Sequence, residues 1–190
     1  MQIQLNLEDP TSKREVPLLR DHTFIPLNIE CEGRVMKVED DHLRVIPAPV
    51  IFVAFITLGL GLNWMLPLLF LANVLVARVA GFFVVGVSFL VGGSAVVEMR
   101  RHHTSPNPHK PVTALVEDGV FRYSRNPVYL SLLVLYVGIA ICVNVLWLIL
   151  LCPALYWSVE KLMVKPEEDY LERRFSIDYV QYKKRVRRWI

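Results

Sequence analysis

Three long blocks without charged residues dominate the chain. They cover residues 50–71, 79–97 and 128–159, which are 22, 19 and 32 residues long. A helix crosses a hydrocarbon core about 30 Å thick with about 20 apolar residues, so the first two blocks each predict one membrane-spanning helix. The third block would be about 48 Å long as one helix at about 1.5 Å per residue, which exceeds the thickness of a bilayer.

The third block is therefore expected to form a helical hairpin. Asn144 lies near its middle and predicts the turn, with one helix over residues 127–143 and a second over residues 145–165. Basic residues flank the block, beginning with Arg125 on one side and Lys161 on the other. Because basic flanks favour the cytoplasm, both belong on the same side of the membrane, which requires an even number of crossings between them.

These elements define the expected fold class as an all-α integral membrane protein with about four transmembrane helices. A C-terminal helical hairpin is followed by short cytoplasmic helices that begin near Pro166 and Ser176. Both termini are expected in the cytoplasm, and the first span is expected to act as the insertion signal because no cleavable signal peptide is visible. The expected domains are a polar cytoplasmic segment 1–47 and a membrane domain 48–190, with spans at about 50–71, 79–97, 127–143 and 145–165 and a cytoplasmic tail 166–190.

Composition and charge refine the expected partners. The chain is 54% hydrophobic with a net charge of +3, and nine basic residues against five acidic ones follow residue 160. Such a tail favours the anionic headgroups of membrane lipids; nucleic acid is not an expected partner, and no obligate protein partner is evident. Cys31, Cys142 and Cys152 form no spaced cluster, so neither a disulfide nor a metal site is expected.

The second block and the loop after it contain two further patterns. Ser88 and Gly92 have the small-residue spacing that lets membrane helices approach closely. The proline-rich loop that follows contains His102, His103 and His109, and is expected at the aqueous surface or lining a cavity. Histidine titrates near neutral pH, so these residues are candidate bases, although tandem histidines in a loop are more often simply solvated.

Candidate chemistry concentrates at the start of the third block, over residues 119–130. Pro127 suits the first position of a helix, so Arg125 and Asn126 lie at a helix N-terminus, which favours anionic ligand groups. The hairpin brings the pair Glu167-Glu168 to the same end of the membrane. A cation and an acid pair at one helix mouth can hold a zwitterion, but an arginine and acids that merely anchor helix ends remain an open alternative.

A longer pattern that includes this site resembles a known family. It consists of Thr113-Ala114-Leu115-Val116, Gly119-Val120-Phe121, Arg125-Asn126-Pro127-Val128-Tyr129, Glu167-Glu168, and the aromatic residues Phe175, Tyr179 and Tyr182. The pattern is similar to that of the membrane methyltransferases that include isoprenylcysteine carboxyl methyltransferase and the phospholipid N-methyltransferases. The resemblance extends over about residues 47–190.

The resemblance implies an enzyme that uses S-adenosylmethionine as its cofactor and transfers the methyl group directly to a lipophilic acceptor. Arg125 is the candidate catalytic residue, as the positive group that faces an anionic acceptor. The cofactor-binding residues that the resemblance implies are Thr113, Ala114, Leu115, Val116, Gly119, Phe121, Asn126, Pro127, Val128, Tyr129, and Glu167 or Glu168.

Several alternatives remain open for the acceptor and the reaction. An isoprenylcysteine-like carboxylate or a related amphiphile is expected, and a phospholipid amine is the alternative. Asn126 stands where the isoprenylcysteine enzymes usually carry histidine, and its amide donates hydrogen bonds but cannot transfer a proton near neutral pH. Lys161 and Lys165 stand where those enzymes place an arginine. An NADPH-dependent membrane reductase and a non-enzymatic membrane scaffold are the other candidate functions.

Overall fold

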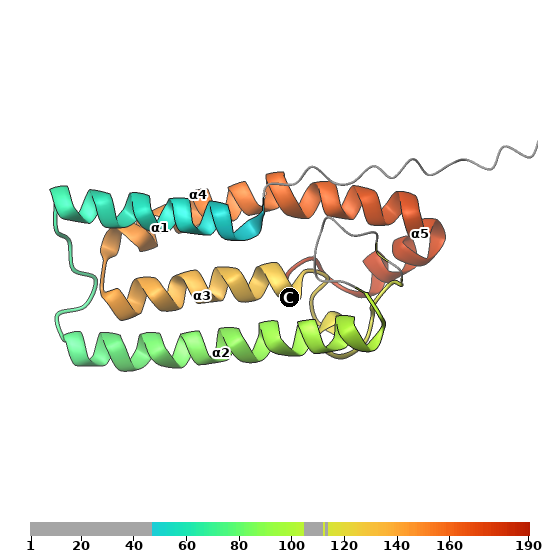
Figure 1. The fold of residues 1–190 in the computed structure, drawn as a ribbon, viewed down its shortest axis with the longest axis horizontal. Coiled ribbons are helices and arrows are strands. Elements are labelled where there is room, and N and C mark those ends of the chain that lie inside the picture. The colour runs from blue at the N-terminus through green and yellow to red at the C-terminus, as the bar shows by residue number, and fades with distance from the viewer. Residues whose placement is uncertain (1–46, 105–111, 113) are drawn as a thin grey trace, which may run out of the picture. The chain divides into compact units, whose positions relative to one another are not determined.

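Helices form every regular element in the part of the chain that the structure describes. The computed structural model describes residues 47–104, 112 and 114–190, which all fall in the compact unit Val38–Ile190. The expected segment 1–47 (apart from residue 47), His109 and Thr113 lie outside the described residues. The all-α prediction is confirmed by α1 (Ala48–Met65), α2 (Val74–Arg101), the 3₁₀ helix η1 (Gly119–Arg122), α3 (Pro127–Val143), α4 (Leu146–Val159), the π-helix η2 (Glu160–Val164) and α5 (Lys165–Arg185) (Figure 1).

Three helices are long and apolar enough to cross a membrane. They are α1, α2 and the continuous helix Leu146–Arg185, which joins α4, η2 and α5, whereas α3 is apolar but has only 17 residues. Large apolar side chains of α2, among them Phe82, Phe83 and Phe89, are exposed. Exposed apolar surface of this kind suits contact with lipid tails. The protein is therefore an integral membrane protein, as the sequence predicts.

The continuous helix is too long to lie wholly inside a bilayer. Its part before the kink at Ser176, residues 146–175, would alone extend about 45 Å at about 1.5 Å per residue. Apolar residues fill α4, whereas charged residues recur along the whole of α5. Only the α4 part therefore belongs in the hydrocarbon core, and α5 lies beyond it.

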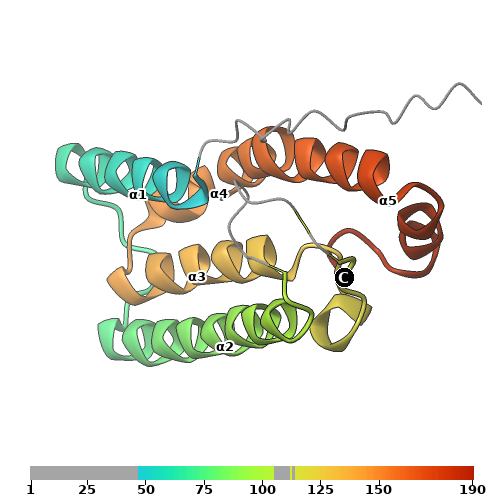
Figure 2. The same cartoon turned by 45° about the vertical axis from the view of Figure 1, so that its right-hand side comes forward.

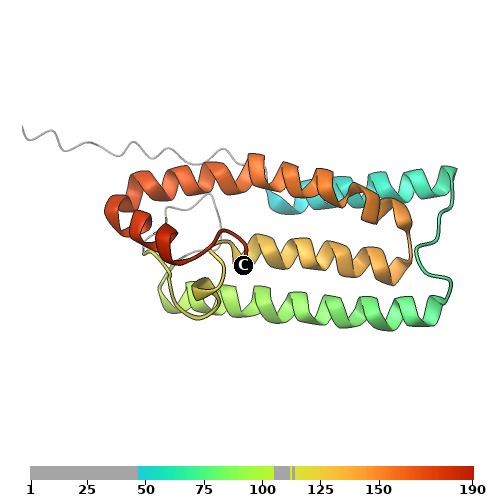
Figure 3. The ribbon, with the colours of Figure 1, turned by 180° about the vertical axis from the view of Figure 1, so that it is seen from behind.

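The predicted helix start near Ser176 is confirmed, whereas near Pro166 α5 continues directly from the preceding helix instead of starting separately. Pro166 lies in the first turn of α5, directly after η2. Because proline has no amide hydrogen for the preceding turn, a wide π-helical turn before it keeps the helix continuous. At Ser176 the backbone leaves the helical region, with φ 44° and ψ −112°. The chain bends there, and the C-terminus returns to the start of α3 (Figures 2 and 3).

The connection between the first two helices differs from the predicted span boundaries. The sequence predicts a first span as far as Leu71, but α1 ends at Met65. Pro67 disfavours the helical conformation of the residue before it, and Leu66 is extended, with φ −139°. The second helix begins at Val74, before the predicted residue 79, because the Asn73 side chain caps it by accepting from the amides of the residues two and three positions later.

The predicted turn at Asn144 is confirmed. Asn144 separates α3 from α4 and adopts the left-handed conformation, with φ 55° and ψ 46°. Its side chain accepts hydrogen bonds from the amides of Phe70 (3.2 Å) and Leu71 (2.8 Å) and donates to the carbonyl of Leu71 (2.8 Å). This residue therefore joins the two connections at one end of the helices (Figure 1).

We expect Asn144→Ala to lower the free energy of unfolding by about 2–4 kcal/mol. The substitution removes three partly buried hydrogen bonds and places alanine in a left-handed conformation that disfavours it. Asn144→Gly is the matched variant, since glycine tolerates the conformation and loses only the hydrogen bonds. Thermal unfolding in detergent should rank wild type above glycine and glycine above alanine; equal stability of all three would contradict the role of this turn.

Small residues bring α2 and α3 close together, as the Ser88 and Gly92 spacing predicts. The Ser88 hydroxyl donates to the carbonyl of Ser131 at 2.9 Å, and a Cβ atom at Gly92 would lie 2.7 Å from the Ser131 hydroxyl. A Cβ atom at Gly81 would lie 2.5 Å from backbone atoms of Cys142. The helices therefore run side by side at a separation that larger residues prevent, and this packing holds the start of α3 in place.

Candidate functional site

A buried ionic cluster lies where the start of α3 meets α5 and the C-terminal tail. A nitrogen of Arg125 lies 2.9 Å from Oε1 of Glu168, and their side chains are only 9% and 6% exposed. Arg188 binds the same carboxylate through two nitrogens, at 3.2 Å and 2.7 Å. Glu168 is therefore held by two guanidinium groups, one from the start of α3 and one from the C-terminal tail, and the two-nitrogen contact of Arg188 fixes geometry as well as charge.

Arg188 connects this cluster to a second acid. Its remaining terminal nitrogen contacts Glu160 of η2 at 2.8 Å. Hydrogen bonding to Glu168 and the charge of both acids raise the pKa of Arg188 above its ordinary value, so this side chain stays charged. The sequence places Arg188 only within a basic tail suited to lipid headgroups, and nothing in the sequence distinguishes it from its basic neighbours.

Three hydrogen bonds to backbone carbonyls of the tail fix it against the start of α3. The amide of Arg125 donates to the carbonyl of Arg187 at 3.1 Å. The Ser124 hydroxyl and the Asn126 side-chain amide both donate to the carbonyl of Arg188, at 3.2 Å and 3.4 Å. Asn126, predicted as a cofactor ligand, therefore also holds the tail in place.

Glu167 differs from its neighbour Glu168. Its carboxylate interacts with the Tyr129 hydroxyl, and burial raises the pKa of this carboxyl, an effect that the Tyr129 hydrogen bond opposes and the charge of Glu168 reinforces. Its Oε2 atom is buried and accepts no hydrogen bond from any described residue. Nε of Arg125 is also buried, and it donates no hydrogen bond to any described residue. Among Arg125, Glu167 and Glu168, the described residues thus leave one buried acceptor and one buried donor unsatisfied.

Aromatic residues of α5 link the ionic cluster to the segment before α3. The Tyr179 hydroxyl lies 3.4 Å from Arg125, and burial raises the pKa of Tyr179 to about 12. Tyr179 contacts Tyr182 at a ring-centroid distance of 6.2 Å, and the Tyr182 hydroxyl donates to the carbonyl of Phe121 at 2.7 Å. Phe121 is buried with Val116 against α2 in a small apolar cluster.

The structure therefore brings several of the predicted site residues into two adjoining groups. Arg125, Asn126, Tyr129, Glu167 and Glu168 form the polar group at the mouth of α3. The apolar group consists of Val116, Phe121 and Val128, with Ala95 of α2 beneath them. The other predicted residues among those described are the partly buried Ala114 and Leu115, the exposed Gly119 and the buried Pro127.

A bundle of apolar helices with a buried ionic cluster beyond their ends defines an integral membrane protein with a polar site next to the bilayer. The profile of one family, described as phospholipid methyltransferase, matches residues 76–178. The chain therefore belongs to the phospholipid methyltransferase family, and the resemblance to membrane methyltransferases is confirmed. No curated protein and no solved structure matches it. The matched region includes Arg125 and the acid pair, whereas Arg188 lies outside it.

Proposed function

We propose that the protein transfers the methyl group of S-adenosylmethionine to an acceptor dissolved in the membrane. Membership of a methyltransferase family supports the reaction class. The observation that carries the cofactor assignment is the pair of unsatisfied buried atoms, Oε2 of Glu167 and Nε of Arg125. A buried polar atom without a partner costs free energy, so it marks a place where a ligand can supply that partner.

The amino-acid part of the cofactor is a zwitterion, and the site has a group for each of its charges. Glu167 is the proposed partner of the ammonium group, because its carboxylate lacks a cationic partner. Arg125 and the N-terminus of α3 are the proposed partners of the carboxylate. Glu168 already binds two arginines, so its proposed task is to hold Arg125 in position.

The remaining predicted residues are the proposed walls for the rest of the cofactor. The apolar group of Val116, Phe121 and Val128 adjoins the polar group through Tyr182 and Tyr179. The other proposed wall residues are Thr113, Ala114, Leu115, Gly119, Asn126, Pro127 and Tyr129.

When bound, S-adenosylmethionine supplies a methyl group activated by a positively charged sulfur. With the cofactor held by Glu167 and Arg125, the chemistry supplied would be a direct transfer in which the new bond to the methyl carbon replaces the carbon–sulfur bond. The residues of the chain contribute by holding the donor in line with the acceptor and by excluding water. Arg125, the residue that the sequence offers as the catalytic group, is assigned here to the carboxylate of the cofactor, so its proposed contribution to the transfer is to hold the donor in position.

The acceptor is proposed to be an amphiphile that reaches the site from the bilayer. The polar group lies at the start of the apolar helix α3, so a lipid headgroup or a lipid-anchored carboxylate meets it at the membrane surface. A phospholipid amine is the second candidate, which the family description favours. An amine loses a proton on methylation and so needs a base, whereas a carboxylate does not.

Methyl-labelled S-adenosylmethionine tests the proposal. Membranes that contain the wild-type protein should incorporate label into the lipid extract, membranes without the protein should not, and membranes with the Glu167→Gln variant should incorporate much less when the cofactor is limiting. Base-labile label identifies a methyl ester, and base-stable label in a headgroup identifies a methylated amine. Label confined to the aqueous metabolites would refute the proposed reaction, and equal labelling by the wild-type and variant membranes would refute the proposed role of Glu167.

We further propose four crossings, with both termini in the cytoplasm. Single cysteines introduced at Arg101 and Lys184, in a background without native cysteines, should react with an impermeant reagent only when the cytoplasmic side is accessible. A cysteine at Ala72, in the connection between α1 and α2, should react from the opposite side. Labelling of positions 72 and 184 from the same side would contradict this topology.

A further inference from the structure

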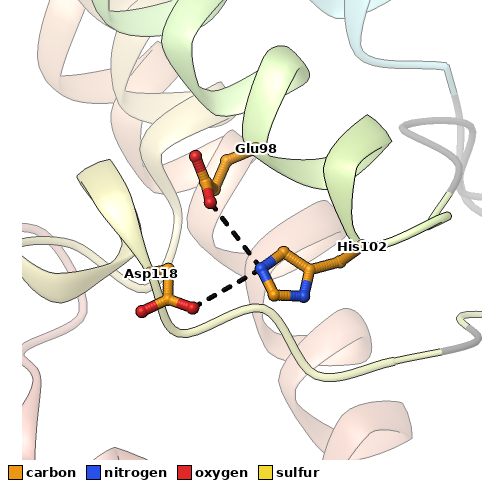
Figure 4. A group of neighbouring side chains, drawn as sticks. All are labelled: Glu98, His102 and Asp118. Carbon is orange, nitrogen blue, oxygen red and sulfur yellow. Dashed lines mark ion pairs between the residues drawn. The ribbon is translucent and has the colours of Figure 1, made fainter.

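A second polar cluster lies at the C-terminal end of α2, and no part of the proposed reaction uses it. Glu98 and His102 are four residues apart and so share one face of α2. Nε2 of His102 points between two carboxylates, at 3.6 Å from Oε1 of Glu98 and 3.5 Å from Oδ2 of Asp118 (Figure 4). The nitrogen and the two oxygens all lie within 4.8 Å of one another.

These separations are close to those of ligands around a small metal ion. Zinc binds imidazole nitrogen and carboxylate oxygen at about 2.0–2.2 Å in a tetrahedron, which places neighbouring ligand atoms about 3.3–3.6 Å apart. Two of the observed separations, 3.5 Å and 3.6 Å, fall in that range. An ion can therefore enter with only a small closing movement of the two carboxylates.

The other oxygens of the two carboxylates are held by arginines. Oε2 of Glu98 lies 3.3 Å from Arg101, and Oδ1 of Asp118 lies 2.9 Å from Arg122. The oxygens that face His102 are thus separate from the oxygens that face the arginines. Outer partners of this kind orient the carboxylates around a metal, in the way that groups behind metal ligands commonly do.

The backbone next to Asp118 allows its segment to come close to the end of α2. Gly119 has φ 59°, a conformation that favours glycine, and a Cβ atom there would lie 3.1 Å from Oε2 of Glu98. The hydroxyl of Thr104 bonds both the carbonyl and the amide of Ala114, at 3.2 Å and 3.3 Å. The end of α2 and the segment that carries Asp118 are therefore joined on either side of the cluster.

We propose that Glu98, His102 and Asp118 bind a divalent transition metal ion of the zinc type. One imidazole with two carboxylates favours such an ion over magnesium or calcium, which prefer oxygen ligands alone. Three protein ligands leave a fourth position for water. The ion links α2 to the segment that leads through η1 to Arg125, so its role is to hold that segment in place.

Zinc binding to the full-length protein in detergent tests this proposal. Protein stripped with a chelator and titrated with Zn²⁺ should bind one ion per chain and unfold at a higher temperature, while excess Mg²⁺ should not displace the zinc. His102→Gln and Asp118→Asn should each weaken zinc affinity by about 10-fold to 100-fold or more. His103→Asn is the matched control, since it changes the adjacent histidine, which is outside the ligand set, and should leave the affinity within about twofold.

Two results would overturn the metal site. One is wild-type protein that binds no zinc, and the other is equal zinc affinity in wild type, His102→Gln and Asp118→Asn. Circular dichroism of each variant shows whether it retains the helical fold, and the near-isosteric Asp118→Asn change removes a ligand charge with little effect on packing. Because the readout is zinc affinity, the result does not depend on methyl transfer, and failure of the metal site leaves the proposed reaction intact.

Discussion

Glu168→Gln should lower the free energy of unfolding by about 3–5 kcal/mol, the usual cost of removing one partner from a buried ion pair. Glu168 is the shared partner of Arg125 and Arg188, and the Arg125 side chain is only 9% exposed. A neutral amide leaves this guanidinium buried without a counter-charge. It also loosens the tail, because the two-nitrogen contact of Arg188 needs both carboxylate oxygens. Thermal or chemical unfolding in detergent measures the effect.

The chain supplies a matched control on the same helix. Glu172 pairs with Lys183 at 2.8 Å, but these side chains are 44% and 34% exposed. Exposed pairs contribute little, so Glu172→Gln should cost less than about 1 kcal/mol. If the two glutamine variants were equally stable, the ionic cluster around Glu168 would not be the main link between α5 and α3.

Local sequence signals were sufficient to predict the helices and much of the polar group. The length of the third uncharged block requires a turn, and Asn144 provides it because asparagine tolerates the left-handed conformation found there. Pro127 marks the start of α3, which places Arg125 at its mouth. The hairpin then returns the acid pair to the same end. These predictions depend on short sequence segments or on the number of membrane crossings, and both can be read from one sequence.

The tertiary contacts of the tail could not be predicted in the same way. Arg188 reaches Glu168 because the chain bends at Ser176 and because three hydrogen bonds fix the tail to the start of α3. Neither the bend angle nor the docking is encoded in a recognisable motif. The cluster of Glu98, His102 and Asp118 could not be predicted either, because a proline-rich stretch of sequence separates Asp118 from the other two residues.

The different roles proposed for Glu167 and Glu168 also depend on three-dimensional structure. Adjacent residues of a helix point about 100° apart, so only one of them faces a given neighbour. Glu168 faces the arginines, and Glu167 faces Tyr129. The sequence predicts an acid pair at the site but contains nothing that assigns the two orientations.

Glu167→Gln should have the opposite effect to Glu168→Gln: a stable protein that binds cofactor poorly. Burial raises the pKa of Glu167, so its ionised form costs free energy in the folded protein, and a neutral amide removes that cost. The variant should therefore be at least as stable as wild type, with its advantage growing as pH rises through the raised pKa. Loss of the charged partner of the ammonium group should cost about 1.5–3 kcal/mol of binding, which is about 10-fold to 150-fold in affinity for S-adenosylhomocysteine.

The pH dependence of this affinity distinguishes a binding role from a structural one. In the proposed site the ammonium group binds the ionised carboxylate, so wild-type affinity for S-adenosylhomocysteine should fall as pH is lowered through the raised pKa of Glu167. The Glu167→Gln variant has no such group and should bind weakly with less dependence on pH. Calorimetry in detergent over a series of pH values measures both proteins. Wild-type affinity in the variant, or an unchanged pH profile, would show that Glu167 does not contact the cofactor.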